Sequence, residues 1–343
     1  MTTAEYVYRP MQVEADAWDR LVADAPHLSL IQTGAFSDAK AAAGPWQAER
    51  GLIWANGSAV GATQAMVRKI PGMNRGLAWV NRGPFVLGDA DDAPSHQAGM
   101  LAALNAHFAD ERGLYLRIAP MCAAAAFDDQ WAAATGLRIT ETLGWSSAIV
   151  DLQQSPETLR KGLHGKWRNA LKQAEQADIS VRQGSDNNLF TAFLAGHREQ
   201  STRLGDDIGI SADFLEALQA GLPDDRKIYV LLADVAGMPA GGIAIAKFGQ
   251  TGEYIAGHNN DVGRKHNAGQ RLLWAAMMHL QNAEFGNFDL GGMDEKLTPP
   301  GIFRFKDRVG GAPYRLANEL EGGFEPFINR LIRWRVTKAR MAI

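Results

Sequence analysis

The chain has 343 residues, 46% of them hydrophobic, which is enough for about two globular domains with ordinary cores. Lysine and arginine number 35 and aspartate and glutamate 38, so the net charge of −3 excludes a strongly basic nucleic-acid-binding protein, and any such contact requires a local patch. A single cysteine, Cys122, excludes an internal disulfide and a zinc site made of several cysteines.

The two halves of the chain share one order of expected elements. Residues 52–62 (LIWANGSAVGA) and 232–242 (LADVAGMPAGG) each read as a strand, a glycine turn and a second strand, and Gly57 aligns with Gly237 at an offset of 180. Glycine hairpins also recur by chance in α/β proteins, but the order of the later elements favours a duplicated unit. These elements are a strand, a helix and a strand, expected near 77–80, 94–112 and 114–118 in the first half and 253–258, 268–284 and 287–290 in the second.

The boundary between the halves is expected in 140–154, because residues 145–152 read as a strand and a helix start follows. Ser155 is a candidate N-cap, and Pro156 suits the first helical position. No linker rich in proline, glycine or serine separates the halves. We therefore assign a first domain to residues 1–145 and a second to residues 146–343, with a basic helix at its C-terminal end.

Two basic clusters interrupt the near-neutral average. Residues 160–172 (RKGLHGKWRNALK) contain five lysines or arginines and no acid, and the C-terminal stretch is likewise basic. Basic helices that carry an aromatic residue can bind phosphate backbones, but they can equally be solvated helix faces, and both interpretations stay open. In the C-terminal stretch, the apolar residues expected on one broad helix face are Phe327, Ile328, Leu331, Ile332 and Trp334.

Several familiar sites are missing from the sequence. No set of histidine, acidic or cysteine residues has the spacing of metal ligands, and no Walker A loop, Rossmann fingerprint or nucleophile elbow occurs. Residues 264–269 (RKHNAG) precede an expected helix, as does the R/Q-x-x-G-x-G/A loop that binds the coenzyme A pyrophosphate in GNAT acetyltransferases. Arg264 and Gly269 fit that loop, whereas Asn267 replaces its first glycine. This resemblance indicates a GNAT-like fold that need not use coenzyme A.

Residues 289–311 (DLGGMDEKLTPPGIFRFKDRVGG) place an aromatic and basic core between glycines and prolines. This pattern predicts the end of a strand, an ordered loop and a short return element. Lys306, flanked by Phe303 and Phe305, is a candidate for stabilising an oxyanion in acyl transfer to an amine. The other interpretation is an exposed lysine beside two core phenylalanines. The candidate general bases here are Asp289, Asp294 and Glu295.

Together these pieces resemble the FemABX family of aminoacyl-tRNA-dependent peptidyltransferases, which add amino acids to an amine of peptidoglycan precursors. The resemblance covers nearly the whole chain and implies an α/β (α+β) fold of two tandem GNAT-like domains packed around a cleft. No coiled-coil arm is expected, as in the shorter, FemX-type members. The residues that carry it are Gln32–Lys40 (QTGAFSDAK), Arg82-Gly83-Pro84, Lys166–Lys172 (KWRNALK), Arg203, Tyr254, Leu272–Trp274, Asp289–Gly292 and Gly301–Gly311 (GIFRFKDRVGG).

The resemblance also implies roles for single residues. Lys40 matches the lysine that contacts the nucleotide diphosphate of the acceptor, and Arg203 matches a second basic contact to it. Tyr254 matches a substrate-lining tyrosine, and Lys306 matches the lysine close to the transferred ester. Family members often have an acid where this chain has Ala119, which puts the standard acceptor in question. Further residues implied are Phe303 and Phe305 for substrate and Lys166, Arg168 and Lys172 for tRNA.

The expected function is transfer of an amino acid from charged tRNA to an amine of a peptidoglycan precursor or of a related peptide or small molecule. We expect no cofactor and no metal, with aminoacyl-tRNA as co-substrate and a nucleotide-linked muropeptide or another amine as acceptor. Alternatives are an acyl-CoA-dependent N-acyltransferase and a non-catalytic binding duplicate. The first ten residues lack an apolar signal core, and no run reaches the roughly 18 apolar residues of a membrane span. We therefore expect a cytoplasmic monomer.

Overall fold

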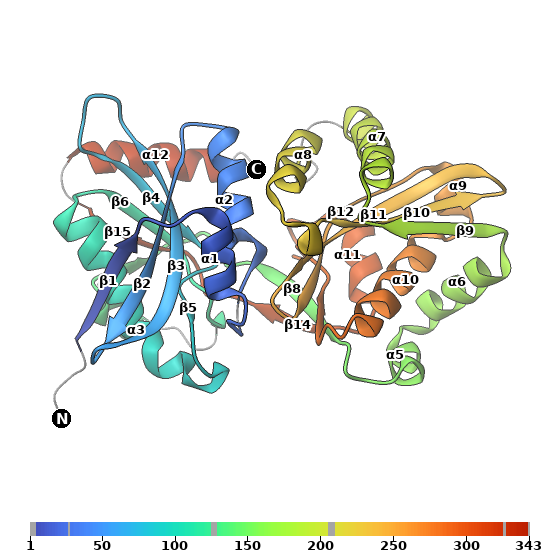
Figure 1. Cartoon of the computed structure of the whole chain (residues 1–343), viewed down its shortest axis with the longest axis horizontal. Helices are drawn as coiled ribbons and strands as arrows, with labels where there is room; N and C mark the ends of the chain where they lie inside the picture. The colour runs from blue at the N-terminus through green and yellow to red at the C-terminus, as the bar shows by residue number, and fades with distance from the viewer. Residues whose placement is uncertain (1–4, 27, 125–128, 205–209, 325–326, 342–343) are drawn as a thin grey trace. The chain divides into compact units, whose positions relative to one another are not determined.

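The computed structural model describes residues 5–26, 28–124, 129–204, 210–324 and 327–341. It divides into two compact units, each built on one mixed β-sheet (Figure 1). Unit 1 comprises Met1–Trp145 and Arg315–Ile343, and unit 2 comprises Ser146–Tyr314. The mixed α/β architecture predicted from the sequence is confirmed.

Unit 1 has a sheet in the order β1-β2-β3-β4-β6-β15-β7, with β5 paired to β3. Helix α3 packs against β1, β3 and β5, and its buried face lies in the core of this unit. The strands are β1 Tyr6–Met11, β2 Gln47–Ala55, β3 Ser58–Lys69, β4 Gly76–Asn81, β5 Phe85–Val86, β6 Tyr115–Ala119, β7 Arg138–Ile139 and β15 Leu320–Gly322. The helices are α1 Ala15–Val22, α2 Gly34–Ala42, α3 Ala93–Leu104 with a π-helical continuation Asn105–Glu111, α4 Asp129–Ala134 and α12 Phe327–Met341.

Unit 2 has a sheet in the order β14-β8-β13-β12-β11-β10-β9. Helix α7 packs against β10, β11 and β12, while α10 packs against β10, β11 and α6 and contributes to the core (Figure 1). The strands are β8 Ser146–Asp151, β9 Ile179–Gly184, β10 Tyr229–Val235, β11 Met238–Phe248, β12 Thr251–Asn259, β13 Asn287–Asp289 and β14 Ala312–Arg315. The helices are α5 Pro156–Gly162, α6 Gly165–Gln176, α7 Asn187–Leu204, α8 Ala212–Gly221, α9 Asp261–Lys265, α10 Ala268–Asn282 and α11 Pro300–Asp307.

The two glycine hairpins have the same backbone conformation. Asn56 and Gly57 have φ of 51° and 82°, and Ala236 and Gly237 have φ of 48° and 78°. Two consecutive positive φ values are those of a type I′ turn, whose twist matches that of the paired strands. In each hairpin the register then skips one residue of the second strand, Val60 or Ala240. A helix and a parallel strand follow in both units, as the sequence repeat predicts.

The chain passes from unit 1 to unit 2 and back again. Strand β8 begins at Ser146 and pairs with β13, so the second sheet begins at the expected boundary. Residues 315–343, assigned to the second domain from the sequence, lie instead in unit 1. The physical reason is the pairing of β15 with β6 and β7, secured by a buried ion pair of 2.6 Å between Arg117 Nε and Glu319 Oε2. Glu319 just before β15 and Glu321 within it look like surface residues, so the sequence does not show this burial.

Residues 289–311 fold as expected in outline, and the return element is a helix. Strand β13 ends at Asp289, and Pro300 occupies the first turn of α11, where the missing N–H of proline costs no hydrogen bond. The helix ends before Gly310, whose φ of 85° suits a residue without a side chain. Within α11, Lys306 is on the buried face.

Candidate active site

The short strand β13 pairs in parallel with only the first residues of β12. The register runs from Thr251↔Asn287 to Glu253↔Asp289 and stops there. Next along β12, Ile255 is skipped in the pairing with β11, so this strand carries a β-bulge directly after Tyr254. Bulges locally redirect side chains and are common beside active sites. The candidate site lies where the two strands part.

Lys306 points into this region from α11. Its side chain is 7% exposed, and its Nζ donates to the carbonyl oxygen of Gly292 at 3.0 Å. The same Nζ lies 4.9 Å from the centroid of the Tyr254 ring, a cation–π distance. Lys306 is therefore buried, and the interpretation as an ordinary exposed lysine is wrong.

Helix α11 is held in place by α6. The indole of Trp167, which is 2% exposed, donates through Nε1 to the carbonyl oxygen of Phe305 at 3.1 Å. The rings of Trp167 and Phe305 also lie 6.0 Å apart. Phe303 and Phe305 are partly buried and pack against the core of unit 2. The two phenylalanines flanking Lys306 thus help to hold its helix, and their contact with substrate stays a prediction.

Burial disfavours the charged form of Lys306, and two nearby carboxylates favour it. Burial lowers the pKa of Lys306 to about 8, while the nearby carboxylates of Asp289 and Glu253 act in the opposite direction. The ammonium form still predominates at neutral pH because this pKa lies above 7. A buried cation with few fixed partners can stabilise negative charge more strongly than one in water.

Asp289 organises the turn beneath Lys306. One of its carboxylate oxygens accepts from the Ser147 hydroxyl and from the backbone N–H of Gly291 at 2.8 Å, and the other accepts from the Tyr314 hydroxyl at 2.6 Å. Gly291 has φ of 69°, and a β-carbon there would collide with the carbonyl oxygen of Tyr254 at 2.3 Å. Asp289 is therefore an acceptor that fixes the Gly291 turn.

The other two acidic candidates for a general base are placed differently. Asp294 is buried, and its carboxylate accepts from the backbone N–H groups of Lys296 at 2.8 Å and Leu297 at 3.0 Å. It thereby closes the loop that precedes α11. Glu295 is exposed. The geometry gives both of the bonded acids, Asp289 and Asp294, a structural role.

The structure brings Tyr254 and Lys306 together in unit 2. Lys40 is half-buried in the last turn of α2 in unit 1. That helix is anchored by Thr33, whose side chain caps it, and by Gln32, which donates to the carbonyl oxygen of Asn81 at 2.7 Å. Arg203 is exposed in the last turn of α7. Burial raises the pKa of Tyr254 to about 12, so its hydroxyl stays protonated.

The basic residues of helix α6 differ in whether they bond to the protein backbone. Lys166, Arg168 and Lys172 are all exposed. Arg168 Nη1 donates to the carbonyl oxygens of Lys161 at 3.0 Å and Leu163 at 3.3 Å, so Arg168 secures the end of α5. Binding of tRNA by these residues stays a prediction, and Lys166 and Lys172 are its better candidates.

The segment that resembles a coenzyme A loop has its side chains engaged within unit 2. Asn267 adopts the left-handed conformation, with φ of 59°, and donates to Gln173 of α6 at 3.2 Å. A side chain at Gly269 would meet the ring of Phe305 at 3.6 Å. Arg264 is paired with Asp261. Residues of α6 and α11 therefore lie against the start of α10, where the pyrophosphate would bind in an acetyl-CoA-dependent relative.

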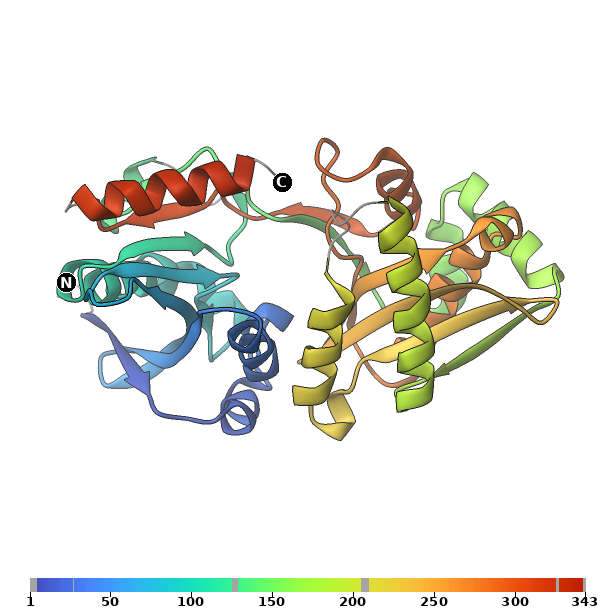
Figure 2. The ribbon, with the colours of Figure 1, turned by 90° about the horizontal axis from the view of Figure 1, so that it is seen from above.

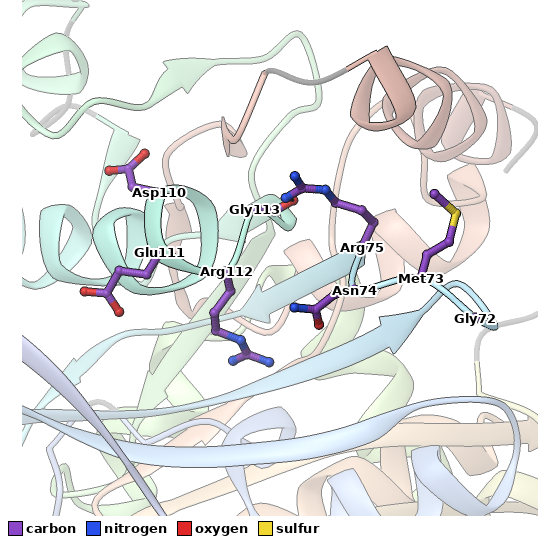
Figure 3. Close-up of a pocket in the computed structure, with 8 residues that line it drawn as sticks. All are labelled: Gly72, Met73, Asn74, Arg75, Asp110, Glu111, Arg112 and Gly113. Carbon is purple, nitrogen blue, oxygen red and sulfur yellow. Dashed lines mark hydrogen bonds between the residues drawn. The ribbon is translucent and has the colours of Figure 1, made fainter.

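A recess of about 550 Å³ lies in unit 1 (Figure 3). Arg75 Nη1 crosses it to the carbonyl oxygen of Gly113 at 2.9 Å, and Arg112 is paired with Glu49 at 2.6 Å. Both of its arginines are thus engaged within unit 1, and none of the predicted site residues lines it. The lining residues are Gly72, Met73, Asn74, Arg75, Asp110, Glu111, Arg112 and Gly113. Among the described residues, no group of three or more histidine, cysteine or acidic side chains could hold a metal ion.

Comparison with known proteins shows which family and which solved structures this chain is similar to. Residues 160–307 match the family described as an acetyltransferase (GNAT) domain. A crystal structure of FemX superposes with a TM-score of 0.71 at 15% identity, over 91% of this chain and 96% of that one. Conserved protein of unknown function from Bacteroides thetaiotaomicron VPI-5482 gives 0.60 at 9% identity, over 92% of this chain and 99% of that one. L-PGS from Bacillus licheniformis gives 0.53 at 13% identity, over 94% and 99%. A comparison with curated protein sequences finds no match.

Sequence reasoning missed the supporting parts of the site. Ser147 and Tyr314 come from β8 and β14, and the sheet order β14-β8-β13 brings both to the side of Asp289 only in the folded protein. The bulge at Ile255 has one local signal in Gly257, where a β-carbon would lie 2.0 Å from the Tyr254 hydroxyl. The predicted acyltransferase is supported by the family match and the fold together. Residues 160–307 match a GNAT acetyltransferase domain, and the chain has a fold similar to that of FemX, as its sequence resemblance predicts.

Proposed function

We propose that the chain is an aminoacyl-tRNA-dependent N-aminoacyltransferase whose acceptor is an amine of a peptidoglycan precursor or of a related peptide or small molecule. The observation that carries the proposal is the buried Lys306 ammonium beside Tyr254, where β12 and β13 part. The likeness of the fold to FemX supports this class of reaction over other acyl transfers.

In the proposed reaction an amine nitrogen attacks the ester carbonyl that joins the amino acid to the tRNA ribose. The C–N bond forms, the ester C–O bond breaks, and the departing ribose oxygen takes up the proton that the amine loses. Negative charge develops on the carbonyl oxygen in between. The Lys306 ammonium stabilises this oxyanion, and one preorganised donor of this kind contributes about 3–4 kcal/mol.

Two features make Lys306 suited to act as a cation rather than as a base. The Tyr254 ring, 4.9 Å from Nζ, favours a positive charge, and the bond to the Gly292 carbonyl, at 3.0 Å, holds Nζ in place. With a pKa of about 8, the amine is mostly protonated at neutral pH. The leaving ribose hydroxyl accepts the proton, so the mechanism needs no protein base.

An acyl-CoA donor is the second candidate, because the matched family is described as an acetyltransferase. One assay separates the two donors. The protein is incubated with pools of tRNA carrying labelled amino acids, or with labelled acyl-CoA, together with amine acceptors, and label is followed into the acceptor. Transfer from tRNA supports the proposal. Transfer from acyl-CoA alone contradicts it, and binding of tRNA or acceptor without any transfer would indicate a non-catalytic duplicate.

A further inference from the structure

One face of helix α12 is anchored to unit 1. It packs against β4 and β6, and in Figure 2 it lies along the outer side of that unit. Asn329, which is 1% exposed, donates to the carbonyl oxygen of Gly323 at 2.8 Å. Arg333 Nε donates to the buried carboxylate of Glu321 at 2.9 Å. These bonds fix the rotation of the helix about its axis.

The opposite face presents large apolar side chains to solvent. Phe327 is 70% exposed, Leu331 45% and Trp334 59%. Their spacing of four and three residues places them in one stripe along the helix. The sequence analysis expected these three on one broad apolar face with Ile328 and Ile332. The structure separates the two sets, because only Ile328 and Ile332 are half-buried.

Cations border this stripe, and acids are absent from it. By helical spacing, Arg330 and Arg335 lie on its two sides, and Lys338 continues it by one turn. Lys338 Nζ lies 5.3 Å from the Trp334 ring. The sequence of α12 contains no aspartate or glutamate, although the whole chain is negatively charged. The exposed face is thus apolar along its centre and basic along its edges.

Three kinds of partner differ in how they would meet this face. A second copy of α12 in a symmetric dimer would bring like charges together around the apolar stripe. RNA would satisfy the arginines, but Leu331 cannot stack on a base. A membrane surface with anionic headgroups takes the apolar side chains into its boundary region, pairs the cations with phosphates and suits a tryptophan at the interface.

We propose that the α12 face formed by Phe327, Leu331 and Trp334 and bordered by Arg330, Arg335 and Lys338 binds anionic lipid surfaces, with the helix lying in the plane of the membrane. Among the described residues, no helix is long and apolar enough to cross a membrane, so this attachment is peripheral. It does not depend on the proposed donor or acceptor, and its test needs no turnover.

The test is flotation of the full chain with vesicles. Wild type should float with vesicles of equal parts phosphatidylcholine and phosphatidylglycerol and stay behind with pure phosphatidylcholine. The double variant Leu331→Asp, Trp334→Ser should bind the anionic vesicles at least tenfold more weakly. Arg335→Gln with Lys338→Gln should weaken binding about tenfold or more, since each cation near such a surface adds to affinity.

Met238→Asp is the matched control, because Met238 is 54% exposed at the β10–β11 hairpin and outside α12. It should bind vesicles as wild type does. Brominated lipids should quench fluorescence in wild type more than in Trp334→Phe, which checks the inserted side without changing the fold. Equal flotation of wild type and the α12 variants, or no flotation of wild type, overturns the proposal. A loss of tRNA affinity in the α12 variants without any vesicle binding assigns the face to RNA and also overturns it.

Discussion

The two units differ in the length over which their corresponding parallel strands are paired. In unit 1 the parallel strands β4 and β6 stay paired over five residue pairs, from Leu77↔Tyr115 to Asn81↔Ala119. In unit 2 the corresponding strands β12 and β13 pair over three residue pairs, and this pairing ends before the β12 bulge at Ile255. The duplicated unit thus keeps a closed version and an open version of one strand pair.

The two units also differ in the polar side chain buried near these strands. In unit 1 the amide of Gln32 donates to the carbonyl oxygens of Asn81 at 2.7 Å and Gln64 at 3.2 Å, and its oxygen accepts from the Gln64 N–H at 2.8 Å. A neutral amide satisfies the backbone there. In unit 2 the buried cation Lys306 donates to the Gly292 carbonyl just beyond the end of β13. The buried polar group of unit 1 thus serves the structure, whereas we propose that the buried charge of unit 2 serves the chemistry.

The largest expected effect is on turnover when the charge is removed. Lys306→Met keeps a chain of similar length without the ammonium, so transfer should fall by about a hundredfold to a thousandfold. Folding should be retained, because the variant also removes the cost of burying a charge. Single-turnover transfer and thermal melting measure both. Lys296→Met changes an exposed lysine in the loop that precedes α11; it is the control and should keep its rate.

Asp289→Asn tests how the turn supports Lys306. Loss of the carboxylate removes an interaction that raises the pKa of Lys306, so the pH above which the rate falls should move downward. The rate at neutral pH should fall about tenfold, because charged acceptors bind N–H groups more strongly than neutral ones. A pH–rate profile measures both effects. An unchanged profile would mean that Asp289 serves only the fold.

Gln32→Leu should destabilise unit 1 where Gln32 bridges β3 and the end of β4. It leaves the Gln64 N–H and the Asn81 carbonyl without their buried partner, which costs about 1–3 kcal/mol for each such group. The free energy of unfolding should fall accordingly in a urea titration. A stability equal to that of wild type would remove the Gln32 network from the account of unit 1.

The smallest expected effect is on tRNA affinity. Lys166→Gln with Lys172→Gln removes two exposed cations of α6, so affinity should weaken and the slope of log K against log salt should drop by about 1 to 2. Filter binding at several salt concentrations measures the slope. Arg168→Gln is a contrasting variant, because it also releases the end of α5 and should lower the melting temperature. An unchanged slope in the double variant would make α6 a solvated face.

Local patterns were sufficient to predict much of the fold. Three features depend only on residues close together in the sequence, and each is confirmed: the glycine turns with positive φ, the Ser155 cap and helix α10. The return of β15 to unit 1 could not be predicted, since Glu319 and Glu321 look like surface residues until Arg117 pairs with them. Lys306 was found through resemblance and its flanking pattern. Its burial and its neighbours depend on Ser147, Asp289 and Tyr314, which meet only when three strands assemble.

The central claim is that a buried cation at position 306 stabilises the oxyanion, and the pH dependence of transfer tests it most directly. Lys306 must be protonated for this role, so its contribution is present below a pH of about 8 and is lost as the pH rises further. The rate of aminoacyl transfer by wild type should therefore fall above that pH. The Lys306→Arg variant stays charged, so its remaining rate should not fall above that pH. A wild-type rate that keeps rising through pH 9, with Lys306→Arg unaltered in profile, would contradict the claim.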